Sequence, residues 1–211
     1  CFAWYSWSIM GQGEDIVERM DLRGARPSRV SVVGSTGTGK TTFARELAAI
    51  LGARHVELDA MFWGPDWSHL EPEEFRERIG PVISAASWVI DGNYGGAGVR
   101  ELVWAQADTI IWLDFSLAVI FARLWSRTMA RIRDGKELWP GTGNRETIRN
   151  AFLSRDSLFL WAAKTYRPRK RNYTALFGIA EHAHLVKLRF RSPAEADRWL
   201  QAERERAAAR I

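Results

Sequence analysis

Cysteine is almost missing from this 211-residue sequence, since the single one is Cys1. No disulfide can form within the chain, which excludes the small secreted proteins that depend on disulfides for their stability. A cysteine count of this kind fits a reducing compartment, and we expect a cytoplasmic location.

Long apolar runs are also missing. The most apolar segment is residues 1–10, and it is shorter than the roughly 20 residues that a helix needs to span a bilayer. It also lacks the basic start of a signal peptide. We expect residues 1–27 to lie outside the folded core, as an extension or through a start site assigned upstream of Met10 or Met20. A membrane-surface anchor is the alternative.

What the sequence does contain is enough apolar material for one folded domain. Hydrophobic residues make up 46% of the chain and aromatic residues 12%, which excludes disorder as the dominant state. The formal net charge is +5 and the sequence pI about 9.7. This balance favours anionic partners such as nucleotides, nucleic acids or acidic surfaces, without choosing among them.

Short apolar runs alternate with segments of helical periodicity. The runs predict strands at 29–33, 55–58, 88–91, 109–114 and 184–188. Helices are predicted at 41–51, from 71 onward, at 116–133, at 146–171 with a break at Pro168, and from Ser192 to the C-terminus. Alternation of this kind predicts an α/β fold with a parallel five-stranded sheet covered on both faces. We expect one domain, 28–211, with insertions at about 60–87 and about 123–173.

A glycine-rich segment between the first strand and the first helix matches the phosphate-binding pattern G-x-x-x-x-G-K-[ST] at every fixed position. Its glycines let successive backbone N–H groups converge on one anion, and the following helix adds its positive dipole end. The lysine is placed to reach the β- and γ-phosphates, and the threonine hydroxyl to coordinate Mg²⁺. We therefore expect ATP or GTP with Mg²⁺ to bind at Gly34, Ser35, Thr36, Gly37, Thr38, Gly39, Lys40, Thr41 and Thr42.

Three aspartates lie at the carboxyl ends of predicted strands and are candidates for the chemistry beside the phosphates. Asp91 is the preferred partner of Thr41 for Mg²⁺, and Asp114 is the weaker candidate because helix-entry residues follow it. Asp59 follows the second strand, and ligands of open α/β sheets bind off the carboxyl ends of the strands. Asp59 is therefore a candidate to orient or deprotonate an acceptor hydroxyl, with a helix cap as the alternative.

Aromatic residues lie close to these aspartates in sequence. Trp63, Trp67 and Tyr94 are placed to stack on a base or a sugar ring, or else to fill the core.

The insertion after the fourth strand is strongly basic. Residues 123–171 contain thirteen lysines and arginines and four acidic residues, a difference of +9. Arg123, Arg127 and Arg131 are spaced by four and share one helix face. Such arginines stabilise the charge of a transferring phosphoryl group. A solvated basic face and a nucleic-acid surface are the alternatives, and the cluster 167–171 is typical of a surface patch.

Taken together, these motifs are similar to those of the adenylate-kinase-like P-loop proteins. The strings Leu-Asp-Ala-Met-Phe-Trp (58–63) and Asp-Gly-Asn-Tyr (91–94) resemble the subgroup labelled DNA-topology-modulation protein. The resemblance covers about 29–200 and implies a strand order 2-3-1-4-5 as in nucleoside monophosphate kinases. It also implies an acceptor-binding insertion after the second strand and an arginine-bearing lid.

The resemblance extends to single residues with one departure. It implies that Asp91-Gly92 ends the third strand and that Arg123 and Arg127 hold ATP phosphates. Where those kinases carry Phe-Pro-Arg, with an arginine for the acceptor phosphate, this chain has residues 93–95, Asn-Tyr-Gly. The lid, at about 134–144, is short and has no zinc ligands.

Two functions follow from these features. The first is a phosphotransferase that moves the γ-phosphate to a nucleotide or another small hydroxylated acceptor, with Lys40, Asp59, Arg123 and Arg127 as catalytic residues and Thr41 and Asp91 as metal ligands. The second is a nucleotide-dependent protein that binds nucleic acid through residues 123–171. No membrane span is expected in either case.

Overall fold

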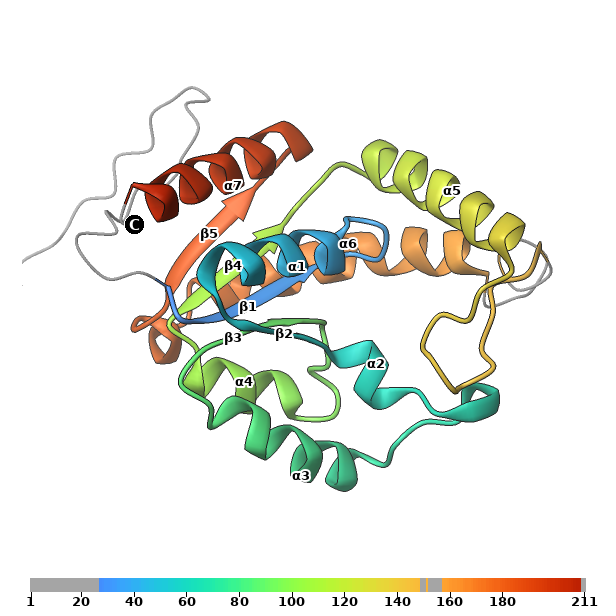
Figure 1. Cartoon of the computed structure of the whole chain (residues 1–211), viewed down its shortest axis with the longest axis horizontal. Coiled ribbons are helices and arrows are strands. Elements are labelled where there is room, and N and C mark those ends of the chain that lie inside the picture. Colours follow the sequence, from blue (N-terminus) through green and yellow to red (C-terminus); the bar gives the residue numbers. More distant parts are fainter. Residues whose placement is uncertain (1–26, 149–150, 152–156, 210–211) are drawn as a thin grey trace, which may run out of the picture.

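A computed structural model gives the arrangement of residues 27–148, 151 and 157–209 (Figure 1). The expected N-terminal extension falls almost wholly outside the described residues. Within the described ranges, no helix is both long and apolar enough to cross a membrane.

The centre of the molecule is a sheet of five strands, all parallel. The spatial order is β2-β3-β1-β4-β5, which confirms the order implied by the resemblance. The strands are β1 (Arg29–Gly34), β2 (Arg54–Glu57), β3 (Trp88–Asp91), β4 (Thr109–Leu113) and β5 (Val186–Phe190). In the register of the sheet Glu57 lies opposite Asp91 and Gly34 opposite Leu113. The carboxyl ends of the central strands therefore meet at one edge.

Helices connect the strands and cover both faces of the sheet (Figure 1). They are α1 (Lys40–Leu51), α2 (Leu58–Phe62), α3 (Pro72–Ile83), α4 (Val99–Gln106), α5 (Leu117–Asp134), α6 (Leu158–Phe177) and α7 (Pro193–Ala208). Short 3₁₀ helices lie at Pro65–Trp67 and Ala180–His182.

The alternation of side chains along the strands divides the core into two layers. Ile110 and Trp112 of β4 pack with α3, α4 and Tyr173 of α6. Ile111 and Leu113 of the same strand point the other way and pack with α1, α5 and α7. Because both faces of each central strand are buried, the strands are apolar throughout, as expected for a parallel sheet.

Three sequence expectations need correction. The expected break at Pro168 is wrong, because α6 runs through this residue. Its packing holds both halves, since Ala162 before the proline and Tyr173 after it are buried. Helix α4 was not expected; its N-cap is Gly98, with a left-handed φ of 72° and no side-chain cap, so the usual sequence signal for a helix start is missing. The fifth strand begins at Val186 rather than at His184.

Helix α6 also begins later than expected. Glu146 and Thr147 are not helical, and α6 starts at Leu158 after its cap Ser157. Residues 149–150 and 152–156 of the expected helix lie outside the described residues.

Candidate functional site

The phosphate loop lies between β1 and α1, as its sequence pattern predicts. Gly37 and Gly39 adopt φ values of 80° and 87°, in the left-handed region where residues with a Cβ are strained. Helix α1 starts directly after Gly39, which caps it with no side-chain acceptor. The first backbone N–H groups of the helix therefore remain available for an anion.

Side chains hold the loop in its curled form. The Thr38 hydroxyl and the Lys40 ammonium both donate to the Ser35 carbonyl, at 2.9 and 3.2 Å. On the other side, Arg123 of α5 donates to the Thr38 carbonyl at 2.8 Å. Arg123 is thus attached to the loop itself, although it lies 85 residues away in sequence.

The two residues expected to hold Mg²⁺ lie together. The Thr41 hydroxyl donates to Asp91 Oδ1 at 3.1 Å, and His55 Nε2 lies 2.8 Å from Asp91 Oδ2. Among the described residues no group of three or more His, Cys, Asp or Glu side chains could hold a metal. One hydroxyl and one carboxylate still fit Mg²⁺, which is usually held by one or two protein carboxylates together with waters and substrate phosphates.

Asp59 lies in the first turn of α2 rather than at a strand end. Its carboxylate accepts a hydrogen bond from the Tyr94 hydroxyl. Burial, followed by the charge of Asp59, raises the pKa of Tyr94 well above its usual range, so the tyrosine remains a donor at neutral pH. This hydrogen bond therefore orients the Asp59 carboxylate. Tyr94 is one of the aromatic residues expected to stack on a ligand or to fill the core.

The charges of both aspartates act on Lys40. Burial lowers the pKa of Lys40, while Asp59 and then Asp91 raise it and Arg169 and Arg127 lower it further. Charges act in this way only over short distances inside a protein. The pKa of Lys40 is therefore set by burial first and by charges of both signs from α2, β3, α5 and α6.

The three arginines that share one face of α5 divide between two partners, the phosphate loop and Glu146. Arg123 lies on the phosphate loop, whereas Arg127 and Arg131 approach Glu146 Oε1 at 3.6 and 2.7 Å. The Arg127 Nε is buried without a hydrogen-bond partner among the described residues. The carboxylate of Glu146 thus reduces the repulsion within this row of cations.

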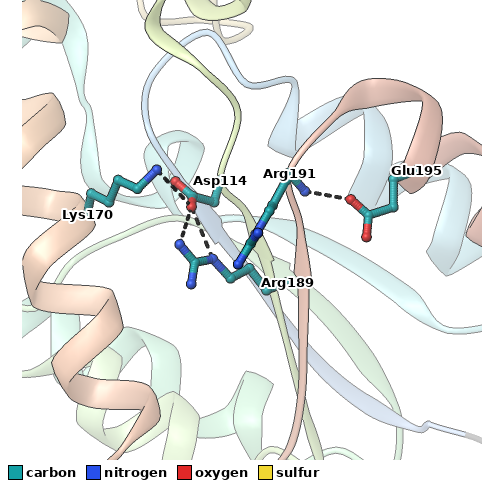
Figure 2. A network of polar contacts seen from close by, with 5 residues as sticks. All are labelled: Asp114, Lys170, Arg189, Arg191 and Glu195. Carbon is teal, nitrogen blue, oxygen red and sulfur yellow. Dashed lines mark hydrogen bonds and ion pairs between the residues drawn. The ribbon is translucent and has the colours of Figure 1, made fainter. Parts of the chain in front are cut away.

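Asp114, the weaker metal candidate, is occupied by cations. It is buried and accepts from Arg189 of β5 at 2.5 Å and lies 3.2 Å from Lys170 of α6. Figure 2 shows both cations converging on its carboxylate, with Glu195 accepting from the Arg191 backbone nearby. Asp114 therefore joins α6 to the edge of the sheet, and Lys170 of the basic cluster 167–171 is not simply a surface charge.

We expect Asp114→Asn to lower the free energy of unfolding by about 2 kcal/mol, because hydrogen bonds to charged groups contribute roughly 1.5–3 kcal/mol. Chemical denaturation measures this loss. Asp134→Asn, which removes an exposed partner of Arg133, is the matched control and should change stability little. Equal effects of the two substitutions would contradict the role given to Asp114.

The aromatic residues of the insertion pack on one another. Trp63 contacts Trp67, and Trp67 contacts Trp139 of the lid, with ring centroids 5.8 and 6.2 Å apart. Asn144 joins the two segments, accepting from the Trp67 N–H and donating to the Gly64 carbonyl. Figure 1 shows the loop after α5 reaching the segment after α2. The insertion and the lid therefore meet, and Trp139 of the lid also donates to Glu57 at the carboxyl end of β2 at 3.4 Å.

Glu57 ends β2 next to Asp91, and its pKa is raised by burial first and by the Asp91 charge second. A raised pKa means that the folded state holds the proton more tightly than the unfolded state, so the contribution of Glu57 to stability is lost as pH rises. We expect Glu57→Gln to raise Tm at pH 7 and the gain to vanish below about pH 4, near the usual range of glutamate. Thermal unfolding across pH measures this. The exposed Glu74→Gln is the control, and an equal gain in that variant would contradict the role given to Glu57.

Sequence reasoning missed four residues of this region. His55 contacts Asp91, and Asn93 bonds both backbone groups of Gly34, at 3.2 and 2.6 Å. Tyr173 donates to Asn93 at 2.7 Å, and Arg169 acts on Lys40. Only Asn93 had a local signal, because it follows Asp91-Gly92. The other three residues lie on β2 and α6 and reach the site only through the fold.

Comparison with known proteins gives a partial likeness in sequence and a broad likeness in fold. No protein-family model matches the chain. A cytidylate kinase of Nitratidesulfovibrio vulgaris strain DP4 is 36% identical over 88 residues, which is 37% of this chain and 36% of the relative. The homologous kinase of the Hildenborough strain is 35% identical over the same length. The chain thus spans just over a third of the curated relatives that it matches.

Among solved structures, shikimate kinase from Acinetobacter baumannii in complex with shikimate superposes with a TM-score of 0.50. The two chains are 14% identical, and the superposition covers 87% of this chain and 94% of that one. This chain has the P-loop kinase fold. A gluconokinase from Sinorhizobium meliloti has a TM-score of 0.48 at 19% identity. The cytidylate kinase and shikimate kinase comparisons agree with the P-loop kinases in general and do not support the subgroup labelled DNA-topology-modulation protein.

Proposed function

We propose that this chain is a small-molecule kinase that transfers the γ-phosphate of Mg-ATP or Mg-GTP to the hydroxyl of a small acceptor. The observation that carries the proposal is the curled phosphate loop with a hydroxyl–carboxylate pair at its helix end, where Thr41 donates to Asp91 Oδ1 at 3.1 Å. Phosphoryl transfer needs mainly positioning and neutralisation of charge, and these residues supply both.

Each group has a defined task in this proposal. The backbone N–H groups of residues 34–41 and the Lys40 ammonium bind the phosphate chain. Thr41 and Asp91 would hold Mg²⁺, which neutralises phosphate charge when bound. His55 keeps the Asp91 carboxylate in place from the opposite side.

The transfer itself uses Asp59 and the arginines. The acceptor oxygen forms a bond to the γ-phosphorus, the bond between that phosphorus and the bridging oxygen breaks, and the nucleoside diphosphate leaves. The hydroxyl proton passes to Asp59, which Tyr94 orients. Arg123, fixed on the loop, and Arg127, one helical turn further along α5, neutralise the charge that spreads over the transferring oxygens.

An acceptor screen tests this function. Purified protein is incubated with Mg-ATP or Mg-GTP and with nucleoside monophosphates, shikimate or gluconate, and release of the nucleoside diphosphate is followed. We expect release that depends on one class of acceptor. Hydrolysis that proceeds equally without any acceptor would contradict a kinase.

The alternative is a nucleotide-dependent protein that binds nucleic acid through residues 123–171. Against it, several cations of this stretch already have carboxylate partners, including Arg127, Arg131 and Lys170. The alternative predicts DNA or RNA binding with a steep salt dependence and no acceptor turnover. Our proposal predicts acceptor turnover, and no DNA or RNA binding with a steep salt dependence.

A further inference from the structure

A largely buried glutamate follows the lid and faces two arginines of α5. The side chain of Glu146 is 9% exposed, and its Oε1 lies 2.7 Å from Arg131 Nη1 and 3.6 Å from Arg127 Nη2. Glutamates are almost never buried to this extent unless they are paired with a cation. The carboxylate therefore lies among cations of which one, Arg127, is assigned to phosphate in the proposed function.

Arg127 belongs to a row of cations that starts at the phosphate loop. Arg123 donates to the Thr38 carbonyl of the loop at 2.8 Å. Arg127 follows one helical turn later on the same face of α5. It is the next cation along this face, and in this structure its charge is directed to Glu146.

The contact between Arg127 and Glu146 is incomplete. Its length of 3.6 Å exceeds that of a normal hydrogen bond, which is roughly 2.7–3.2 Å. The Arg127 Nε and the Glu146 Oε2 are both buried without a hydrogen-bond partner among the described residues. Buried polar atoms without partners cost free energy, and the cost is larger for charged groups. A phosphate group, with several charged oxygens, offers Arg127 the acceptors that this contact does not supply.

The charges around Arg127 explain why a carboxylate is present at all. Burial lowers the pKa of Arg127, the charge of Arg131 lowers it further, and the charge of Glu146 raises it. Two guanidinium groups one helical turn apart repel each other, so an anion beside them stabilises the protein when no phosphate is bound. Glu146 supplies that anion from within the chain.

The segment before Glu146 is held by the insertion after β2. Asn144 is buried, accepts from the Trp67 N–H at 3.0 Å and donates to the Gly64 carbonyl at 2.9 Å. Its own carbonyl accepts from the Leu138 N–H at 2.8 Å, which closes the lid loop. Glu146 follows this fixed point by two residues, so its carboxylate is presented to α5 by a braced segment.

We infer that Glu146 is an internal counter-ion that competes with the terminal phosphate of the nucleotide for Arg127. When phosphate binds, Arg127 exchanges the carboxylate for phosphate oxygens, and Arg131 keeps its shorter contact with Glu146. Glu146 therefore lowers the affinity for the nucleotide. The inference rests on the proposed kinase function in naming the competing anion a nucleotide phosphate, whereas the competition itself applies to any polyphosphate at the loop.

Isothermal titration with inorganic tripolyphosphate tests the competition. Glu146→Gln should bind this probe about fivefold more tightly, at the lower end of the usual coupling between two competing interactions. The glutamine keeps an oxygen for Arg131, and circular dichroism should show the variant folded. Glu137→Gln is the matched control, since it removes an equal charge from an exposed lid residue that accepts from the Gly141 N–H. Its affinity should change by less than about twofold, because exposed charges are screened.

A double-mutant cycle identifies the arginine involved. In an Arg127→Gln background, the Glu146→Gln substitution should bring no gain in affinity, because the two residues act on each other. Three results would overturn the inference. They are a Glu146→Gln protein that binds tripolyphosphate no better than the wild type, an equal gain in Glu137→Gln, and a full gain in the Arg127→Gln background.

Titration of the same proteins with Mg-AMP-PNP separates this inference from the kinase function. A similar gain in Glu146→Gln is expected with the nucleotide analogue. If neither protein binds Mg-AMP-PNP, the kinase function is contradicted, and the tripolyphosphate titration still decides the role of Glu146. If both proteins bind Mg-AMP-PNP with equal affinity, the inference is wrong and the kinase function is unaffected.

Kinetics provide a second test. For an acceptor that releases the diphosphate, Glu146→Gln should lower the nucleotide KM and leave kcat within about twofold, because the residue affects binding without touching the reacting atoms. A residue that only stabilises the fold would not improve KM when it is replaced. A lower kcat with an unchanged KM would contradict the competition.

Discussion

Lys40→Ala is expected to lower kcat/KM for phosphoryl transfer by about 10³-fold, because removal of a single group that stabilises transition-state charge costs roughly 10²–10³ in rate and Lys40 also binds the ground-state phosphates. Its ammonium donates to the Ser35 carbonyl of the loop, and the charges of Asp59 and Asp91 both raise its pKa. Coupled-enzyme assays of diphosphate release measure the loss.

The matched control for Lys40 is Arg45→Ala, which removes an exposed cation from the same helix. Circular dichroism and thermal unfolding should show both variants folded. A Lys40→Ala protein with full activity would show that phosphates bind elsewhere.

Asp59→Asn is expected to lower kcat by about 10²–10⁴-fold, the usual contribution of a positioned general base. The asparagine keeps the shape of the side chain and can still accept from Tyr94, so the local packing is retained. Binding of Mg-nucleotide should change by less than about twofold, since the proposed role of Asp59 is to act on the acceptor. Kinetics and calorimetry on the same preparation separate these two effects.

Asp66→Asn provides the comparison for Asp59 within the same insertion. Asp66 is exposed and has a φ of 52°, a conformation that asparagine also tolerates. We expect near-normal kinetics for it. If Asp59→Asn weakens nucleotide binding and leaves kcat unchanged, Asp59 serves the metal site and is not the base.

Prediction from sequence worked where structure follows from neighbouring residues. The phosphate loop needs its glycines and its lysine in one continuous stretch, and strands buried on both faces leave a continuous apolar signal, as in 88–91 and 109–113. The strand order was implied by the resemblance to adenylate-kinase-like proteins. The pairing of Thr41 with Asp91 followed because adjacent parallel strands end at the same edge.

The rest depends on contacts between distant segments. Asp59 was placed at a strand end, but β2 is only four residues long and α2 begins at once. Pro168 normally disrupts a helix, yet tertiary packing on both sides outweighs the lost hydrogen bond. Arg127 was expected on phosphate, and the contact with Glu146 required knowledge of how the lid folds back. His55, Arg169 and Tyr173 also reach the site only through contacts between distant segments.

Isothermal titration with Mg-ATP and Mg-GTP tests the central claim most directly. The account predicts saturable heat for one binding site per chain with at least one of the two nucleotides, and loss of that heat in Lys40→Ala. A wild-type protein that is folded and gives no heat with either nucleotide would contradict it.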